Sequence, residues 1–266
     1  MTKVKKSSKA YIASALIFLY IPIFVLIFFS FNKSKSRNVF TGFTLNWYKQ
    51  LFHNELVLNA LGVTLAVAAI ASVCATVLGT AAAVGIQSMK KVPRFIVMNV
   101  TYTPVINPEI VTGVSMLLMF TSLRYFINFD MGFTTLVIAH ITFNLPYVIL
   151  SVNPKLRQLD PSIYDAALDL GCSPRQAFFK VVFPQIMPGI TTGFLMALTY
   201  SIDDFVISYF TSGTSQTLSI AIYSMTRRKV SPEINALSTV LFVLILSILL
   251  VMNLKDIKNS KKGNRK

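Results

Sequence analysis

Three acidic residues lie within otherwise apolar stretches, and they are the residues of this chain best suited to chemistry. Glu109 follows Pro108 in one stretch, and Asp203 and Asp204 stand side by side in another. An ionisable side chain inside a membrane is costly unless it is paired or hydrated, so each acid is a candidate functional residue. Tyr200 precedes the aspartates by three and four residues and shares part of their helical face. Carboxylates beside an aromatic ring attract an organic cation through ion pairing and cation–π attraction.

The same acids have structural interpretations that the sequence leaves open. Asp203 and Asp204 would hydrogen-bond the neighbouring backbone near a helix break or reach the outer membrane interface, and Glu109 would be buried in its protonated form. A site for sulfate or phosphate would present cationic side chains or helix N-termini, whereas these stretches contain acids. Another small solute, or an ATP-independent carrier that uses the acids as a proton or cation relay, remains an alternative.

The composition is that of an integral membrane protein. Of the 266 residues, 54% are hydrophobic, and the mean hydropathy is +0.62. The net charge of +15 does not indicate nucleic-acid binding, because the basic residues crowd the ends of apolar stretches, as membrane orientation requires. Cys74 and Cys172 fit neither a disulfide framework nor a metal site, and His53 and His140 stand alone. The sequence has no enzymatic HExxH or GxSxG spacing and no GxxxxGKS/T phosphate loop, so any ATPase is a separate subunit.

Six apolar stretches are long enough to cross a bilayer, which predicts an all-α membrane protein with six transmembrane helices. If the N-terminus is inside, the cytoplasmic segments hold about twice as many Lys and Arg residues as the outer ones. Both termini and the polar segment 160–184 are therefore predicted to be cytoplasmic. The predicted spans cover residues 11–31, 57–86, 95–120, 133–152, 185–210 and 236–254.

Two of these spans have features that bear on packing. The second carries a stripe of small residues, which lets another helix approach closely and predicts a place in the middle of the bundle. In the third, Pro104 and Pro108 each remove an intrahelical hydrogen bond and predict a kink or a break. The stripe comprises Ala68, Ser72, Ala75, Gly79 and Ala83.

The polar segment between the fourth and fifth spans reads as helix, glycine turn, helix. Asp160 is an N-cap residue, and Gly171 stands where a helix C-terminus needs a residue that tolerates positive φ. A capping box from Ser173 to Gln176 begins a second helix, which Pro184 is expected to end.

These two short helices are too polar to span lipid and too apolar to stay solvated, so they need a partner surface. An ordinary cytoplasmic loop that lies on the membrane is the alternative. The side chains to be covered are Ile163, Leu170, Phe178, Phe179 and Val182.

The same segment resembles the EAA motif of bacterial ABC importer permeases, which reads Glu-Ala-Ala, then Gly, then Ile-x-Leu-Pro. The matching residues are Asp165, Ala166, Ala167, Gly171 and the string Val182-Phe183-Pro184. The chain departs from the motif by Asp165 for Glu, Cys172 for a frequent Ala, and Phe183 before the proline. The resemblance implies that Asp165, Ala166, Ala167, Gly171 and Pro184 couple the chain to an ATPase, since in that family the loop enters a cleft on the nucleotide-binding subunit.

Three further strings are similar to permeases of spermidine/putrescine ABC importers: residues 107–111 (NPEIV), 201–208 (SIDDFVIS) and 231–236 (SPEINA). The similarity runs through most of the chain from about residue 55 to residue 250. It implies a MetI-like permease fold that imports polyamines by alternating access, with Glu109, Tyr200, Asp203 and Asp204 as candidate substrate-binding residues.

The expected partners follow from the same resemblance. They are a second homologous permease subunit, a dimer of ATP-binding subunits that holds ATP and Mg, an extracellular polyamine-binding protein and the lipid bilayer, with no cofactor in this chain itself. The expected location is the inner (plasma) membrane. The expected organisation is an N-terminal span and outer loop (1–56), a permease core (57–254) with the hairpin 160–184, and a basic cytoplasmic tail (255–266).

Overall fold

The computed structural model describes residues 6–247 apart from 35–38, 128, 229–232 and 244–245. Within these residues the regular secondary structure is helical, apart from one isolated antiparallel bridge between Asn32 and Phe43. The chain forms two compact units, one of Asn59–Ala221 and one in which Met1–Leu58 joins Ile222–Lys266. The all-α fold class predicted from the sequence is confirmed.

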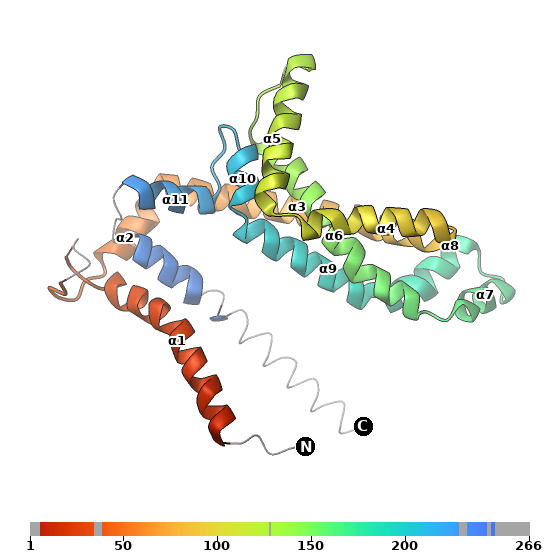
Figure 1. Cartoon of the computed structure of the whole chain (residues 1–266), viewed down its shortest axis with the longest axis horizontal. Coiled ribbons are helices and arrows are strands. Elements are labelled where there is room, and N and C mark those ends of the chain that lie inside the picture. Colours follow the sequence, from red (N-terminus) through yellow and green to blue (C-terminus); the bar gives the residue numbers. More distant parts are fainter. Residues whose placement is uncertain (1–5, 35–38, 128, 229–232, 244–245, 248–266) are drawn as a thin grey trace. The chain divides into compact units, whose positions relative to one another are not determined.

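The helices follow one another with short connections (Figure 1). Their bounds are α1 (Lys6–Ser30), α2 (Asn46–His53), α3 (Glu55–Ser88), α4 (Lys91–Ile106), α5 (Glu109–Phe126), α6 (Phe133–Gln158), α7 (Pro161–Asp169), α8 (Pro174–Ala177), the π-helical turn η1 (Phe178–Val182), α9 (Phe183–Asp203), α10 (Val206–Thr211) and α11 (Leu218–Arg228).

The unit that contains the two ends of the chain begins with α1, which matches the first predicted span. The loop after α1 is organised by Asn32, whose Nδ2 donates to the Val39 carbonyl at 2.8 Å. The Asn32 carbonyl in turn accepts the indole N–H of Trp47, the buried anchor of α2, at 2.7 Å. A helix over Glu233–Val243 begins the sixth predicted span, most of whose remainder, like the predicted basic tail, lies outside the described residues.

The spans of the second unit are longer than predicted and two of them are interrupted. Among the described residues, four helices are long and apolar enough to cross a membrane: α1, α3, α6 and a continuous helix over Pro174–Asp203. The α4–α5 pair makes a fifth if it is counted as one span. Figure 1 shows α3, α4, α6 and α9 running alongside one another, while α5 leaves α4 at a steep angle.

The third predicted span is two helices rather than one. The chain breaks between α4 and α5 at Asn107–Pro108, and the two helix axes differ in direction by 104°. Asn107 is extended, with ψ 144°, because a residue that precedes proline is driven out of the α region. Pro104, the other proline predicted to interrupt the span, lies inside α4 without breaking it.

The fifth predicted span ends earlier than residue 210. Helix α9 stops at Asp203, Asp204 is extended with ψ 126°, and the short helix α10 follows. The prediction of one continuous helix through the two aspartates was therefore wrong. The break places the acids at a helix end instead of within a helix.

Pro184 does not end the second helix of the hairpin, contrary to the prediction. The helix begins at Pro174, passes through the π-helical turn η1 and continues as α9. Phe183 donates its N–H to the Phe178 carbonyl five residues back, and this widened turn makes room for the proline ring that follows. The segment predicted to be a separate cytoplasmic helix is therefore one end of a helix that is long and apolar enough to cross a membrane.

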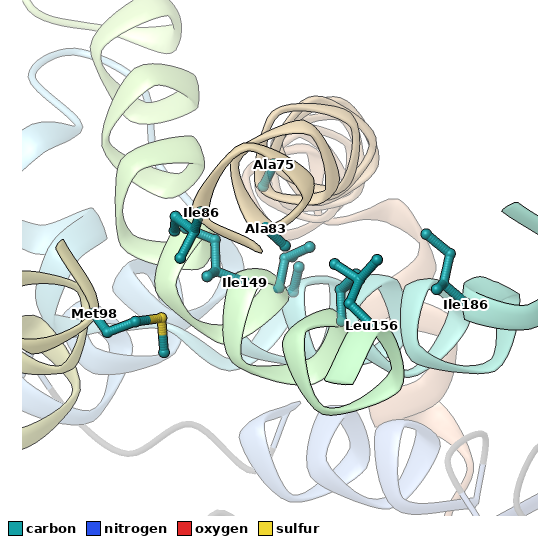
Figure 2. Close-up of a cluster of buried hydrophobic side chains, with 10 residues drawn as sticks. Ala75, Ala83, Ile86, Met98, Ile149, Leu156 and Ile186 are labelled. Atoms are coloured by element: carbon teal, nitrogen blue, oxygen red, sulfur yellow. The ribbon is translucent and has the colours of Figure 1, made fainter. Parts of the chain in front are cut away.

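Helices α3, α6 and α9 pack closely because glycines face α6. A Cβ atom added to Gly189 would lie 2.9 Å from the Ser151 carbonyl oxygen, and one added to Gly79 would lie 2.8 Å from Val148 Cβ. All five residues of the small-residue stripe predicted on α3 are buried, which confirms its place inside the bundle. Figure 2 shows the resulting core, in which side chains of α3, α4, α6 and α9 meet. The labelled members are Ala75, Ala83, Ile86, Met98, Ile149, Leu156 and Ile186.

Candidate functional site

The hairpin between α6 and α9 has the caps predicted from the sequence. The Asp160 side chain accepts the Ser162 N–H at 3.0 Å. Hydrogen bonds from the side chain and the backbone of Ser162 lower the pKa of the exposed Asp160 carboxyl. Gly171 ends the first helix with φ +85°. Ser173 and Gln176 form the reciprocal capping box, with N–H to side-chain distances of 3.0 and 3.4 Å. The turn chemistry of the segment is therefore confirmed.

Part of the apolar surface predicted for the hairpin is open. Leu170 is 87% exposed, Phe179 63% and Ile163 42%. The other two predicted side chains, Phe178 and Val182, are half-buried, and Val182 packs against the buried core of the bundle. The exposed apolar face of the hairpin therefore consists of Leu170, Phe179 and Ile163.

The coupling residues predicted within the hairpin differ in their exposure. Asp165, Ala166, Gly171 and Pro184 are exposed, whereas Ala167 is buried. The buried Ala167 lets α7 lie close to its neighbours, while the acid beside it stays accessible. The coupling role of these residues remains a prediction.

The intramembrane acids lie at the two helix breaks. Glu109 is the first residue of α5, directly after the break that follows α4, and it is exposed. Asp203 is the last residue of α9 and is also exposed. Asp204 begins the connection to α10, and only 4% of its side chain is exposed.

Asp204 is a helix-capping residue. Its Oδ1 accepts the Ile207 N–H at 3.1 Å, and its Oδ2 accepts the Ser208 N–H at 2.6 Å, so it caps α10. The same Oδ2 lies 3.5 Å from Nε2 of His140 on α6, which also contacts the Ser208 hydroxyl at 3.1 Å. The structural alternative, backbone hydrogen bonding at a helix break, is thus observed for Asp204. Its part in substrate binding stays a prediction.

An aromatic cluster joins α6 to α9 near the break that contains Asp203. The ring of Tyr200 lies 4.5 Å from that of Tyr147 and 6.3 Å from that of Phe143, measured between centroids. Phe143 and Tyr147 are themselves 5.5 Å apart. Both tyrosines also pack against a buried cluster that includes Met116 and Phe120 of α5, the helix that begins at Glu109. The fold therefore brings Tyr147 and Tyr200 together beside α5.

A buried hydrogen bond fixes the same junction one turn further along. Asn144 Nδ2 on α6 donates to the Ser201 hydroxyl on α9 at 2.7 Å, and both side chains are buried. Such a bond between apolar helices holds their register, because the polar groups find no water as an alternative partner.

A shallow groove extends along α9 from Tyr200 toward the hairpin. It has a volume of about 360 Å³ and is lined by Thr192, Leu195, Met196, Thr199 and Tyr200. The nine residues from Thr192 to Tyr200 span about 12 Å of helix. The two threonine hydroxyls donate to carbonyls of their own helix, at 2.8 Å each, so their oxygen lone pairs remain able to accept.

Sequence analysis missed Phe143, Asn144, Tyr147 and His140 as members of this region. The four residues recur at spacings of three and four along α6 and therefore share one face of it. That clustering is a signal visible in the sequence. Their contacts with α9 and α10 join residues more than fifty positions apart and are visible only in the fold.

A family described as "Binding-protein-dependent transport system inner membrane component" matches residues 75–258. This range includes the hairpin, the aromatic cluster and all three intramembrane acids. The chain belongs to this family. It is therefore a multi-pass inner membrane permease component of a transport system, and the MetI-like permease fold expected from the sequence is confirmed.

Three bacterial permeases are similar to this chain over most of their length. The putrescine transport system permease PotI of Escherichia coli (strain K12) is 40% identical over 231 residues, which cover 84% of this chain and 81% of the relative. The spermidine/putrescine transport system permease PotC of the same strain is 36% identical over 249 residues, with 93% and 92% covered. PotC of Haemophilus influenzae (strain ATCC 51907 / DSM 11121 / KW20 / Rd) is 34% identical over 244 residues, with 91% and 93% covered.

Solved structures agree with the fold of the permease. A bacterial ABC transporter involved in the import of the acidic polysaccharide alginate has a chain that superposes with a TM-score of 0.69 at 17% identity, covering 92% of this chain and 91% of that one. The alginate transporter in complex with a pentasaccharide-bound periplasmic protein gives a TM-score of 0.67 at 15% identity, with 92% and 90% covered. At these identities the likeness concerns the fold alone.

Proposed function

We propose that this permease translocates polyamines, such as spermidine and putrescine, into the cytoplasm as part of an ATP-driven ABC importer. The observation that carries the proposal is the packing of Tyr147 on Tyr200 beside α5, the helix that begins with Glu109, in a permease whose relatives are named for putrescine and spermidine. A carboxylate beside tyrosine rings suits an organic ammonium ion and does not suit an anion.

The proposed substrate contacts are Glu109, Tyr200 and Asp203. Asp204 is proposed to position Asp203 by holding the backbone at the helix break. Glu109 and Asp203 are accessible and stand at breaks where α5 and α9 leave backbone groups free. Each would replace part of the water shell of the polyamine, weakly enough for release. Asp204 holds the break that presents Asp203, because its oxygens are already engaged by α10 and His140.

The helix breaks between α4 and α5 and between α9 and α10 also allow the helices on their two sides to move relative to one another. The segments after them, α5 and α10, pack on each other so tightly that a Cβ on Gly113 would lie 2.7 Å from Phe210 Cδ2. Helices α3, α6 and α9 form a second close-packed group, which α10 contacts through Ser208 and His140. A shift of the α5–α10 pair against that group would move Glu109 relative to Tyr200, which is what alternating access requires at a binding site.

Coupling to ATP is proposed to pass through the hairpin. Asp165, Ala166, Ala167, Gly171 and Pro184 would dock it on an ATPase dimer that holds ATP and Mg. Because the second hairpin helix continues directly into α9, a push on the hairpin would reach Tyr200 along one continuous helix. ATP binding would open the path outward, and hydrolysis would reset it inward.

The other partners are proposed on the same basis. They are a second homologous permease subunit and an extracellular polyamine-binding protein that delivers the substrate. Both termini and the hairpin would lie in the cytoplasm, and the twofold excess of basic residues on that side supports this orientation.

Purification of the permease in mild detergent with its candidate partners tests this proposal. The expected result is a complex whose ATP hydrolysis rises when spermidine-loaded binding protein is added. Retention of no ATPase, together with spermidine uptake that does not depend on ATP, would indicate a secondary carrier. ATP hydrolysis that responds to another solute and not to a polyamine would keep the class and change the cargo.

A further inference from the structure

Two tyrosines from α6 and α9 meet beside α5, the helix that begins with Glu109. Tyr147 of α6 packs on Tyr200 of α9 at 4.5 Å between ring centroids, with the ring planes tilted by 47°. Both tyrosines pack against the buried cluster that contains Met116 and Phe120 of α5. Both tyrosines are half-buried and Glu109 is exposed, so the cluster has an open side.

The phenol oxygens of this cluster are unused by the protein. Within the part of the chain that the structure describes, neither the Tyr147 nor the Tyr200 hydroxyl has a hydrogen-bond partner, whereas the Tyr48 hydroxyl contacts Ser30 Oγ at 2.7 Å. Tyrosine hydroxyls usually find a partner when they are shielded from water. Phe143, which touches both rings, shows that aromatic packing at this place does not require a hydroxyl.

We propose that Tyr147 is a substrate-contacting residue that, together with Glu109 and Tyr200, receives one primary ammonium group of the transported polyamine. The inference deepens the proposed function and rests on it. A primary ammonium has three N–H donors and no acceptor. One carboxylate and two phenol oxygens supply three acceptors of the matching kind, and the carboxylate also supplies the opposite charge.

The same geometry gives the rest of the polyamine a place to lie. Tyr200 is also one end of the groove along α9, whose lining combines the apolar Leu195 and Met196 with the hydroxyl-bearing Thr192 and Thr199. An ammonium held by Glu109, Tyr147 and Tyr200 would leave the aliphatic chain over Leu195 and Met196. Tyr147 would then distinguish a charged amine end from an apolar one, since its hydroxyl contributes nothing to an alkyl group.

The test uses vesicles that contain the full transporter, supplied with saturating substrate-loaded binding protein. Tyr147→Phe keeps the ring and removes the oxygen, so the initial rate of labelled spermidine uptake should fall about tenfold, the loss expected for one hydrogen bond to a charged group. The abundance of the assembled complex should stay at the wild-type level, so that the lower rate reports transport and not assembly. Tyr125→Phe, at an 89% exposed tyrosine of α5, is the matched control and should change nothing.

A double-mutant cycle with Glu109→Gln separates contact with the substrate from a structural role. If both residues hold one ammonium, the double variant should transport only slightly less than Glu109→Gln alone. Multiplicative effects, or a loss of uptake in Tyr147→Phe that only follows a loss of assembled complex, would overturn the inference. If the wild type and Tyr147→Phe take up spermidine at the same rate, the role of Tyr147 is overturned and the proposed function stays in place. If the wild type takes up no polyamine, both are overturned.

Discussion

Replacing Asp204 with alanine should destabilise the permease, while the adjacent change Asp203→Asn should not. The two carboxylates are neighbours in the sequence but have different surroundings in the fold. Asp204 is 4% exposed, accepts two backbone N–H groups of α10 and lies 3.5 Å from His140. Asp203 is exposed and, among the described residues, accepts no hydrogen bond.

The size of the effect follows from the contacts that Asp204→Ala removes. Loss of the cap on α10 costs about 1 kcal/mol. The buried His140 loses its acidic neighbour but keeps the Ser208 hydroxyl at 3.1 Å, so its share is at the lower end of the range for buried polar groups, about 1 to 2 kcal/mol. The expected total is roughly 2 to 3 kcal/mol.

Thermal denaturation of the detergent-solubilised complex, followed by the loss of monodisperse protein, measures this difference. Asp204→Ala should melt at a clearly lower temperature than the wild type, with Asp204→Asn in between because its amide oxygen still caps α10. Asp203→Asn should melt with the wild type but lose polyamine uptake. An Asp204→Ala variant that melts like the wild type, or an Asp203→Asn variant that melts with the less stable protein, would refute the division of roles.

Three further predictions concern packing and the hairpin. Gly189→Ala should cost about 1 to 3 kcal/mol of stability, because its Cβ would lie 2.9 Å from a backbone oxygen of α6; Gly85→Ala, with nothing within 4 Å, is the control, and equal melting of the two would contradict the packing. Gly171→Ala should strain a φ of +85° by about 1 kcal/mol and weaken ATPase retention on co-purification, so unaltered retention argues against coupling through the turn. The hydrogen bonds that lower the pKa of Asp160 stabilise the hairpin fully at a pH above the ordinary aspartate pKa, and this stabilisation is lost as the pH falls through the lowered pKa. Amide exchange at Ser162 should therefore rise on acidification in the wild type relative to the Asp160→Asn variant. Identical pH profiles of exchange in the two proteins would contradict the capping role of Asp160.

The local chemistry of the hairpin could be predicted from the sequence because it depends on residues three or four positions apart. Asp160, Gly171 and the Ser173–Gln176 capping box each act on their own turn, and each is found as expected. The small-residue stripe of α3 is likewise a periodic pattern that a single segment displays. Such features do not depend on what the rest of the chain does.

The parts that sequence analysis missed depend on tertiary packing. Pro184 was expected to end a helix because proline usually does, but a π-helical turn absorbs it and α9 continues. A helix break near the two aspartates was one of the structural interpretations, but the local pattern did not decide for it, because the break at Asp204 is stabilised by capping and by His140 from another helix. Tyr147 was missed for the same reason, since its contact with Tyr200 requires two helices to be in place.

Uptake of labelled spermidine by vesicles that contain this permease with its candidate second permease, ATPase and binding protein tests the central claim most directly. Uptake should occur when ATP is supplied and stop when a non-hydrolysable analogue replaces it, and Asp203→Asn should abolish uptake in an equally abundant complex. Spermidine uptake that proceeds equally without ATP would contradict the ATP-driven mechanism, and an ATP-hydrolysing complex that leaves spermidine outside would contradict the polyamine assignment.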